Sequence, residues 1–261
     1  MTPRTTSPLG GGAEGTPRTL TVLGCDGSYP GPGGAASGYL VEDGTTTLWL
    51  DAGPGTFARL QQVCDPGAVD AVVLSHEHPD HWTDLESFAV WLRQTGARRP
   101  VPVYAPPGLR RRSYFADDPA LSWREAEPSM RVVVGGMTAS FVATDHGPPT
   151  LAVRIDPAGS GDDRSGSLGY SADTGPDWSL EELGTGIGTV LCEASYTRDL
   201  EGSARHLSGR QAAAMAAGAG AGRLVLTHRW PTVSAGALAA EADEALGRPV
   251  HQAESGRVFE W

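Results

Sequence analysis

The sequence predicts an α/β protein in which two β-sheets lie between outer helices. Two observations lead to this prediction. Short apolar runs bounded by Gly, Pro or Asp recur along the chain, and each has the length of a strand. Helical periodicity appears between some of these runs, so that strands dominate the first half and strands alternate with helices in the second.

The strands are predicted from runs rich in Val, Leu, Tyr and Thr, residues that fit a half-buried pleated surface. In chain order, the predicted strands fall within residues 20–24, 36–43, 46–53, 71–76, 101–107, 131–136, 139–145, 151–155, 168–173, 189–195 and 223–228. The polar segment 156–167, DPAGSGDDRSGS, is rich in Gly, Ser and Asp and predicts a loop between two of them.

Helices are predicted over residues 55–63, 84–95, 208–219 and 234–246. Asp84, Ser208 and Ser234 are the expected N-caps, because a short polar side chain can accept a hydrogen bond from an unpaired N–H of the first turn. We find no internal repeat and no long linker, so residues 19–261 are expected to form a single domain.

Composition excludes several classes of protein. Among the 261 residues, 39% are hydrophobic, which suits a globular core, and no apolar run approaches the roughly 18 residues of a membrane span. Residues 1–18 mix Thr, Pro, Gly and Arg without an apolar stretch, so we expect a disordered tail rather than a secretory signal.

The cysteines and the net charge indicate the cellular compartment and the class of substrate. Cys25, Cys64 and Cys192 are widely separated and form no CxxC pair, which favours a reducing cytoplasm over a disulfide framework or a thiolate zinc site. The net charge of -11 argues against broad nucleic-acid binding, which needs a basic surface. We therefore expect a small-molecule substrate and no membrane association.

The segment LSHEHPDHWTD, residues 74–84, concentrates potential metal ligands at the end of an apolar run. His76 and His78 are two apart, so an extended chain points both imidazoles to one side. Asp80 and His81 follow in the turn that leads to the next helix. The segment can thus present two imidazoles to one point, and a carboxylate with a third imidazole to a neighbouring point.

Three further donors follow apolar runs elsewhere: His146 after FVATD, Asp173 at the end of LGYSAD, and His228 after LVLT. Histidine and carboxylate ligands suit divalent metals such as zinc, and a bridging carboxylate can hold two such ions close together. The sequence therefore predicts a two-metal site.

The chain resembles the metallo-β-lactamase-fold hydrolases, and within them the branch of tRNase Z and small phosphodiesterases. The resemblance covers about residues 19–261. The motifs that carry it are LGCDGSYPGPGGAASGYLVE, LWLDAGPGT, SHEHPDH, DH at 145–146, YSADTGP, CEASY, HLSGRQAA and LVLTHRWP. The resemblance implies an αββα sandwich of two mixed sheets flanked by helices, with its metals at one edge of the sheets.

By the same resemblance, His76, His78 and His146 would hold one metal, Asp80, His81 and His228 the other, and Asp173 would bridge them. A water shared by two divalent ions is acidified toward neutral pH, which gives a hydroxide for attack on phosphorus. Asp80 could also orient that water. Zinc is the favoured metal, with manganese and iron as alternatives.

His206, in RHLSGRQ, has no ligand position left to fill. The resemblance assigns it to stabilising the transition state and donating a proton to the leaving oxygen, with Glu193 as the carboxylate that orients it. Cys192 stands where the family often has a histidine, so the surroundings of Glu193 are expected to differ. His251 is expected to be structural.

Small phosphodiesters such as 3′,5′-cyclic nucleotides are the expected substrates. The family's bacterial tRNases carry a long arm for tRNA between the third-histidine motif and the bridging aspartate, and this chain has no room for one between His146 and Asp173. tRNA 3′ processing is therefore disfavoured. The alternatives are a carboxyl-ester, lactone or thioester hydrolase and a non-catalytic metal-binding protein. The resemblance also allows a homodimer.

Residues beside the ligand motifs could contact substrate. Trp82, Tyr196 and Trp230 could stack on a base or could pack the wall of the site. Arg205 or Arg229 could meet a phosphate.

Overall fold

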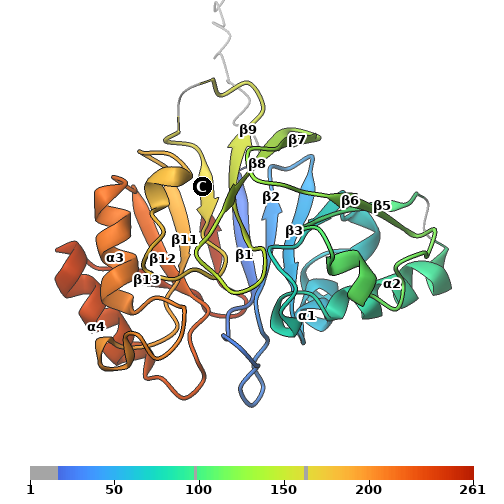
Figure 1. The fold of residues 1–261 in the computed structure, drawn as a ribbon. Coiled ribbons are helices and arrows are strands. Elements are labelled where there is room, and N and C mark those ends of the chain that lie inside the picture. The colour runs from blue at the N-terminus through green and yellow to red at the C-terminus, as the bar shows by residue number, and fades with distance from the viewer. Residues whose placement is uncertain (1–16, 97–98, 162–163) are drawn as a thin grey trace, which may run out of the picture.

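The computed structural model describes residues 17–96, 99–161 and 164–261. Within these residues the chain forms two seven-stranded mixed sheets packed face to face, with helices on their outer faces (Figure 1). The four-layer αββα sandwich expected from the sequence is confirmed. The predicted tail lies outside the described residues except for Pro17 and Arg18, and the Arg18 Nε donates to the Trp261 carbonyl at 3.2 Å.

The first sheet joins the two ends of the described chain. Its spatial order is β14 (Val258–Glu260), β1 (Thr19–Gly24), β2 (Gly38–Glu42), β3 (Thr47–Ala52), β4 (Ala71–Val73), β5 (Val101–Ala105) and β6 (Leu121–Glu125). Strands β3 to β6 run parallel, whereas β14, β1, β2 and β3 pair antiparallel.

The second sheet repeats this mixture. Its spatial order is β13 (His251–Gln252), β12 (Arg223–Thr227), β11 (Thr189–Glu193), β10 (Leu168–Tyr170), β9 (Leu151–Pro157), β8 (Met137–Ala143) and β7 (Arg131–Val134). Strands β10 to β13 run parallel, and β7 to β10 pair antiparallel. Strands β6, β13 and β14 were not predicted, because the last two are short and β6 has only two apolar residues, Leu121 and Trp123.

The predicted helices are confirmed, with ends that differ by at most one residue. They are α1 (Thr56–Val63), α2 (Asp84–Thr95), α3 (Gly209–Gly218) and α4 (Ala235–Leu246). The short 3-10 turns are η1 (Pro66–Ala68), η2 (Pro79–His81), η3 (Leu109–Arg112), η4 (Leu180–Glu182) and η5 (Arg198–Leu200). In α2, Leu85, Phe88, Ala89 and Leu92 follow helical spacing and are buried against the first sheet. No helix of the described segments has the length and apolarity needed to cross a bilayer.

Three apolar clusters correspond to the three interfaces of a four-layer structure. One lies between the sheets and includes Leu50 from β3 and Phe141 from β8. Another lies between the first sheet and α1 and α2, around Trp49 and Phe88. The third lies between the second sheet and α3 and α4. Burial of both faces explains why the central strands read as near-continuous apolar runs.

Two of the three predicted helix N-caps, Ser208 and Ser234, are confirmed. Ser208 accepts from the Gln211 N–H within a capping box, and Ser234 accepts from the Ala237 N–H. Asp84 was wrongly predicted as the N-cap of α2, because Thr83 occupies that position. The Asp84 carboxylate instead accepts from the Phe57 N–H at 2.8 Å, so it satisfies the first turn of α1 and ties the two helices together.

We expect Asp84→Ala to lower the free energy of unfolding by about 1 kcal/mol, because the first turn of α1 loses its side-chain acceptor. Urea denaturation followed by circular dichroism measures the change. Glu244→Ala, which removes an exposed carboxylate from α4, is the control and should stay within about 0.5 kcal/mol of the wild type. Equal stability of Asp84→Ala and wild type would contradict this role.

Candidate metal centre

The predicted ligands lie at one edge of the two sheets because they follow strands that point the same way. Strand β8 is parallel to β10, since each pairs antiparallel with β9, and β10, β11 and β12 are parallel. His146, Asp173 and His228 follow the carboxyl ends of β8, β10 and β12. The segment of His76 to His81 follows β4 in the facing sheet. The structure thus brings all seven predicted ligands together.

The first group of donors is His76, His78, His146 and Asp173. The Nε2 atoms of His76 and His146 lie 3.0 and 3.2 Å from the His78 Nδ1. The Asp173 Oδ2 lies 3.5 Å from the His76 Nε2. Three imidazole nitrogens and one carboxylate oxygen therefore converge on one point, the donor count of a tetrahedral site.

The second group is Asp80, His81 and His228. The two Nε2 atoms of the histidines lie 3.2 Å apart, and the Asp80 Oδ2 lies 3.4 Å from His81 and 3.3 Å from His228. Burial opposes ionisation of Asp80, but the neighbouring His81 and His228 outweigh it and lower the pKa of that carboxyl. A charged oxygen donor is thereby maintained.

Asp173 lies between the two groups. Its Oδ2 faces His76, whereas its Oδ1 lies 3.3 Å from the His81 Nε2 and 3.4 Å from the His228 Nε2. Asp173 is only 1% exposed, and within the described residues its Oδ1 has no hydrogen-bond partner. A buried carboxylate oxygen without a donor is costly, so this arrangement fits a carboxylate that bridges two cations.

Protonation preferences also fit a pair of cations. Burial lowers the pKa of His76, His78 and His146, which keeps these imidazoles neutral and able to ligate. Burial opposes protonation of His81 as well, but the carboxylates of Asp173, Asp80 and Asp51 raise its pKa. The carboxylates therefore favour positive charge at the second group, which divalent ions would supply.

Asp51 is a site residue that the sequence analysis missed. It is the penultimate residue of β3, within LWLDAG, is fully buried, and accepts from the His81 Nδ1 at 2.7 Å. Its carboxylate also accepts from the Ser75 hydroxyl and the Tyr170 hydroxyl, at 2.8 and 2.7 Å. Outer partners of this kind orient a ligating imidazole and select its tautomer. The available signal was an aspartate closing an otherwise apolar strand.

His206 lies beside the two groups and is paired with Glu193, as the resemblance implied. Its Nδ1 lies 2.9 Å from the Glu193 Oε1, and its ring centroid lies 5.2 Å from that of His146 and 5.3 Å from that of His228. Burial disfavours the imidazolium, but the fully buried Glu193 carboxylate outweighs this and raises the pKa of His206 to about 9.

Glu193 is held by groups on both sides. Its Oε1 accepts from the Thr174 N–H at 2.7 Å and its Oε2 from the Ser195 hydroxyl at 2.9 Å. The Ser195 oxygen in turn lies 3.0 Å from the His228 Nδ1, which links the His206 partner to a metal-ligand candidate. Cys192 points to the opposite face of β11 and packs with α3 and α4, so it does not touch this network.

The aromatic candidates divide by burial. Trp82 is buried with its Nε1 donating to the Glu77 carbonyl, and Tyr196 is buried with its hydroxyl donating to the Ala204 and His206 carbonyls. Both therefore form walls of the site. Trp230 is half-buried and lies edge-on to His206, with the ring centroids 6.2 Å apart.

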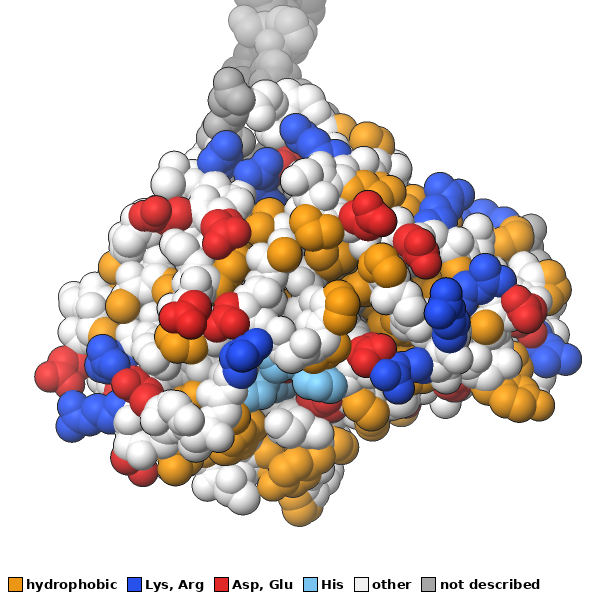
Figure 2. Space-filling model, in the orientation of Figure 1, with side chains coloured by type: hydrophobic (Ala, Val, Ile, Leu, Met, Phe, Trp, Pro, Cys, Tyr) orange, Lys and Arg blue, Asp and Glu red, His pale blue; other side chains and the backbone are white. Residues whose placement is uncertain are grey.

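The two arginine candidates also differ. Arg229 donates to the carbonyls of Trp230 and Val233 and so braces its own loop. Arg205 is 59% exposed on its side chain, and its Nε lies 3.6 Å from the Asp145 Oδ1. Figure 2 shows a basic side chain, drawn in blue, directly beside histidine side chains drawn in pale blue. Of the two, Arg205 is the one whose guanidinium is open to solvent.

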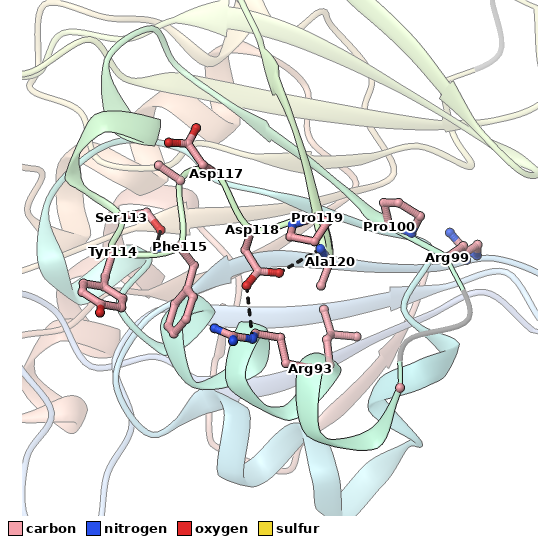
Figure 3. Close-up of a pocket in the computed structure, with 13 residues that line it drawn as sticks. Arg93, Arg99, Pro100, Ser113, Tyr114, Phe115, Asp117, Asp118, Pro119 and Ala120 are labelled. Carbon is pink, nitrogen blue, oxygen red and sulfur yellow. Dashed lines mark hydrogen bonds and ion pairs between the residues drawn. The ribbon is translucent and has the colours of Figure 1, made fainter.

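A cavity lies away from the metal-ligand candidates. A cavity of about 820 Å³ is bounded by the end of α2 and residues 113–120, where the Arg93 Nε lies 3.4 Å from the Asp118 Oδ2 (Figure 3). None of the metal-ligand candidates lines it. Its size alone does not make it an active site, because the groups able to carry chemistry lie elsewhere.

His251 lies on β13, is exposed, and packs edge-on against Phe259 at 5.9 Å between ring centroids. It lies opposite Val225 of the neighbouring strand β12, three residues before His228, and it belongs to none of the groups of metal-ligand candidates found among the described residues.

Comparison with known proteins agrees with this geometry. The family model described as the Beta-lactamase superfamily domain matches residues 46–229. The uncharacterized protein Rv1339 of Mycobacterium tuberculosis is 36% identical over 259 residues, covering 92% of this chain and 91% of that protein. Ribonuclease Z of Mycobacterium avium is 30% identical over 252 residues, covering 83% and 88%.

The probable metallo-hydrolase YhfI of Bacillus subtilis is 29% identical over 251 residues, covering 92% of this chain and 99% of that protein. Its crystal structure, that of a metallo-beta-lactamase fold protein, superposes with a TM-score of 0.85 over 94% of this chain and 99% of YhfI. The chain thus belongs to the beta-lactamase superfamily, as a metallo-β-lactamase-fold hydrolase of the tRNase Z-like branch.

Proposed function

We propose that the protein is a two-metal phosphodiesterase that hydrolyses small phosphodiesters such as 3′,5′-cyclic nucleotides. The observation that carries the proposal is the His206 and Glu193 pair beside the seven metal-ligand candidates. An imidazolium at this position suits an anionic substrate whose leaving group is an alkoxide. General-acid assistance of this kind contributes about 10²–10⁴-fold to a rate.

The donor set supports two divalent ions. His76, His78 and His146 would hold one ion, Asp80, His81 and His228 the other, and Asp173 both. When bound, such ions acidify a water and neutralise charge on phosphoryl oxygens. Nitrogen and oxygen ligands suit zinc, which we propose as the metal, and would also accept manganese or iron.

The residues of the chain then divide the remaining tasks. Glu193 faces the Nδ1 of His206, stabilises the imidazolium and fixes the ring, so the Nε2 proton is the one available to the leaving oxygen. Arg205, open to solvent next to His206, supplies further positive charge for a phosphate. Asp80, at the second group, is positioned to accept a hydrogen bond from an attacking water.

Small substrates suit this surface better than tRNA does. The relative called ribonuclease Z acts, by its name, on RNA, whose linkages are also phosphodiesters. Here His146 and Asp173 are separated by β9, one loop and β10, with no inserted domain. Three consecutive arginines, Arg110 to Arg112, form a basic cluster in η3, but Arg110 forms an ion pair with Asp117 and Arg112 one with Glu77. The net charge of -11 likewise disfavours a polyanion.

A cytoplasmic location goes with this proposal. Cys25, Cys64 and Cys192 are all described, and none is in a disulfide. Burial raises the pKa of the Cys25 and Cys192 thiols to about 12, which makes both unreactive. Thiols of this kind are compatible with a reducing compartment.

Asp173→Ala and His206→Ala should both strongly reduce hydrolysis of 3′,5′-cyclic AMP, but for different reasons. Only Asp173→Ala removes a metal ligand, so only this variant should bind less metal. Chromatography of the product, 5′-AMP, measures turnover, and elemental analysis of the purified variants measures bound metal. Full esterase activity together with no phosphodiester turnover in the wild type would favour the carboxyl-ester, lactone or thioester alternative.

The general-acid role predicts a dependence on the leaving group. His206→Ala should lower kcat for 3′,5′-cyclic AMP by about 10²–10⁴-fold, because its alkoxide must be protonated as it leaves. The loss should be much smaller for bis(p-nitrophenyl) phosphate, whose phenolate leaves without a proton. Initial rates of the two substrates test this. Equal losses for both would show that His206 does not act as the acid.

Removing metal should destabilise the protein, since the buried carboxylates lose their counter-charges. Treatment with a chelator is expected to lower Tm by about 5–10 °C, the shift that corresponds to a ligand present at roughly 100 times its Kd. Differential scanning fluorimetry with and without added zinc measures this shift. Asp173→Ala should show a smaller response, and an unchanged Tm in the wild type would argue against resident metals.

A further inference from the structure

A second cavity, of about 240 Å³, adjoins the metal-ligand candidates. Its walls come from the loop after β5, the turn between β6 and β7, and the loop 143–151 that joins β8 to β9. His146 lines this cavity and also belongs to the first group of metal donors. The cavity and the first group of metal donors therefore share one residue, His146.

The lining is chemically unusual because it is dominated by proline. The prolines that line it are Pro106, Pro107, Pro128, Pro148 and Pro149. Proline has no N–H, so these walls offer few hydrogen-bond donors.

The other lining groups add little polarity. Among the described residues, His146 is the only ionisable side chain that lines the cavity. The Thr144 and Thr150 hydroxyls already donate to the carbonyls of Asp173 and Pro148. An anionic phosphate would be poorly solvated here, whereas an uncharged apolar group would lose little on entering. We call this cavity the proline pocket.

The proline pocket is also pre-formed. The Leu151 N–H donates to the Ser75 carbonyl at 3.0 Å, which ties the loop to the segment that carries His76. The Thr144 N–H donates to the Thr150 carbonyl at 3.1 Å and closes the base of the loop. Because proline rings have little rotameric freedom to lose, such walls bind a flat group at low entropic cost.

Size limits what can enter. The volume is below the roughly 300–1,000 Å³ of sites that enclose a whole drug-sized ligand, so the pocket suits one part of a substrate. Flat rings pack well against proline, as in the recognition of proline-rich peptides by aromatic grooves. Of the aromatic candidates for contact with a ring, Trp82 and Tyr196 are buried, and the half-buried Trp230 lies beside His206 rather than in this pocket.

We propose that the proline pocket packs against the flat face of an uncharged nucleobase while its polar edge stays at the exposed side formed by Ala143, Gly147 and Pro149, so that the enzyme prefers phosphodiesters carrying a nucleobase over those without one. The inference rests on the proposed phosphodiesterase activity and adds the basis of its selectivity. Ala143, which lines the pocket at the exposed end of β8, offers the means to test it. A larger side chain at this position would occupy the space of the ring.

The test compares two diesters with the same leaving group, thymidine 5′-(p-nitrophenyl phosphate) and methyl p-nitrophenyl phosphate, on the zinc-loaded full chain. The wild type should have the higher kcat/KM for the thymidine ester. Ala143→Leu should lower the ratio of the two kcat/KM values by about tenfold or more, chiefly through KM for the thymidine ester. Pro149→Ala, which trims an exposed wall, should lower the ratio by a smaller factor.

Ala240→Leu makes the same change on the exposed face of α4 and should leave the ratio at its wild-type value. Metal content and Tm of each variant identify any that fails to fold, and Pro149→Ala then decides. Equal kcat/KM for both esters in the wild type, or an unchanged ratio in Ala143→Leu and Pro149→Ala, would overturn the pocket but leave the phosphodiesterase standing. No turnover of either ester by the wild type would overturn both.

Discussion

The structure depends on the burial of negative charge between two sheets. Asp173 is enclosed by His76, His81 and His228, and its Oδ1 has no hydrogen-bond donor among the described residues. Asp80 and Asp51 add two further carboxylates next to His81. Burying such charge without compensation is costly, so the fold must bring cations, or groups able to hold them, to this point.

Strand direction meets this requirement. Parallel strands in both sheets end at the same edge, so donors far apart in the sequence converge there without long loops. Close backbone packing then holds the edge together. A Cβ on Gly53, which follows β3, would lie 1.9 Å from the Asp80 carbonyl oxygen, so glycine allows the strand end to pack directly against the turn that carries Asp80.

Two regions next to the centre differ in character. His206 and Glu193 concentrate charge and connect through Ser195 to His228. The proline pocket is nearly without charge and is lined by His146, whose ring centroid lies 5.2 Å from that of His206. A substrate with an anionic diester next to an uncharged ring matches this division. The diester would lie near the charged groups that stabilise it, and the ring would lie in the pocket where it loses few contacts with water.

The sequence by itself determined the αββα architecture and the chemical nature of the site. The periods of the apolar residues distinguish strands from helices. The spacing of His76, His78, Asp80 and His81 keeps these four side chains close together in any fold, because residues two apart in an extended chain point to the same side. Family motifs then indicated His206 and Glu193.

Only the tertiary structure decided which residues support the site. Asp51 lies 30 residues from His81 and Asp84 lies 27 from Phe57, and no local pattern reveals such pairs. The strand β14 is stabilised by pairing with β1 from the other end of the chain, so its own short sequence carries little signal. The proline pocket arises from three separate loops. In each case the decisive contact joins segments distant in the sequence, and its energy depends on packing rather than on local propensity.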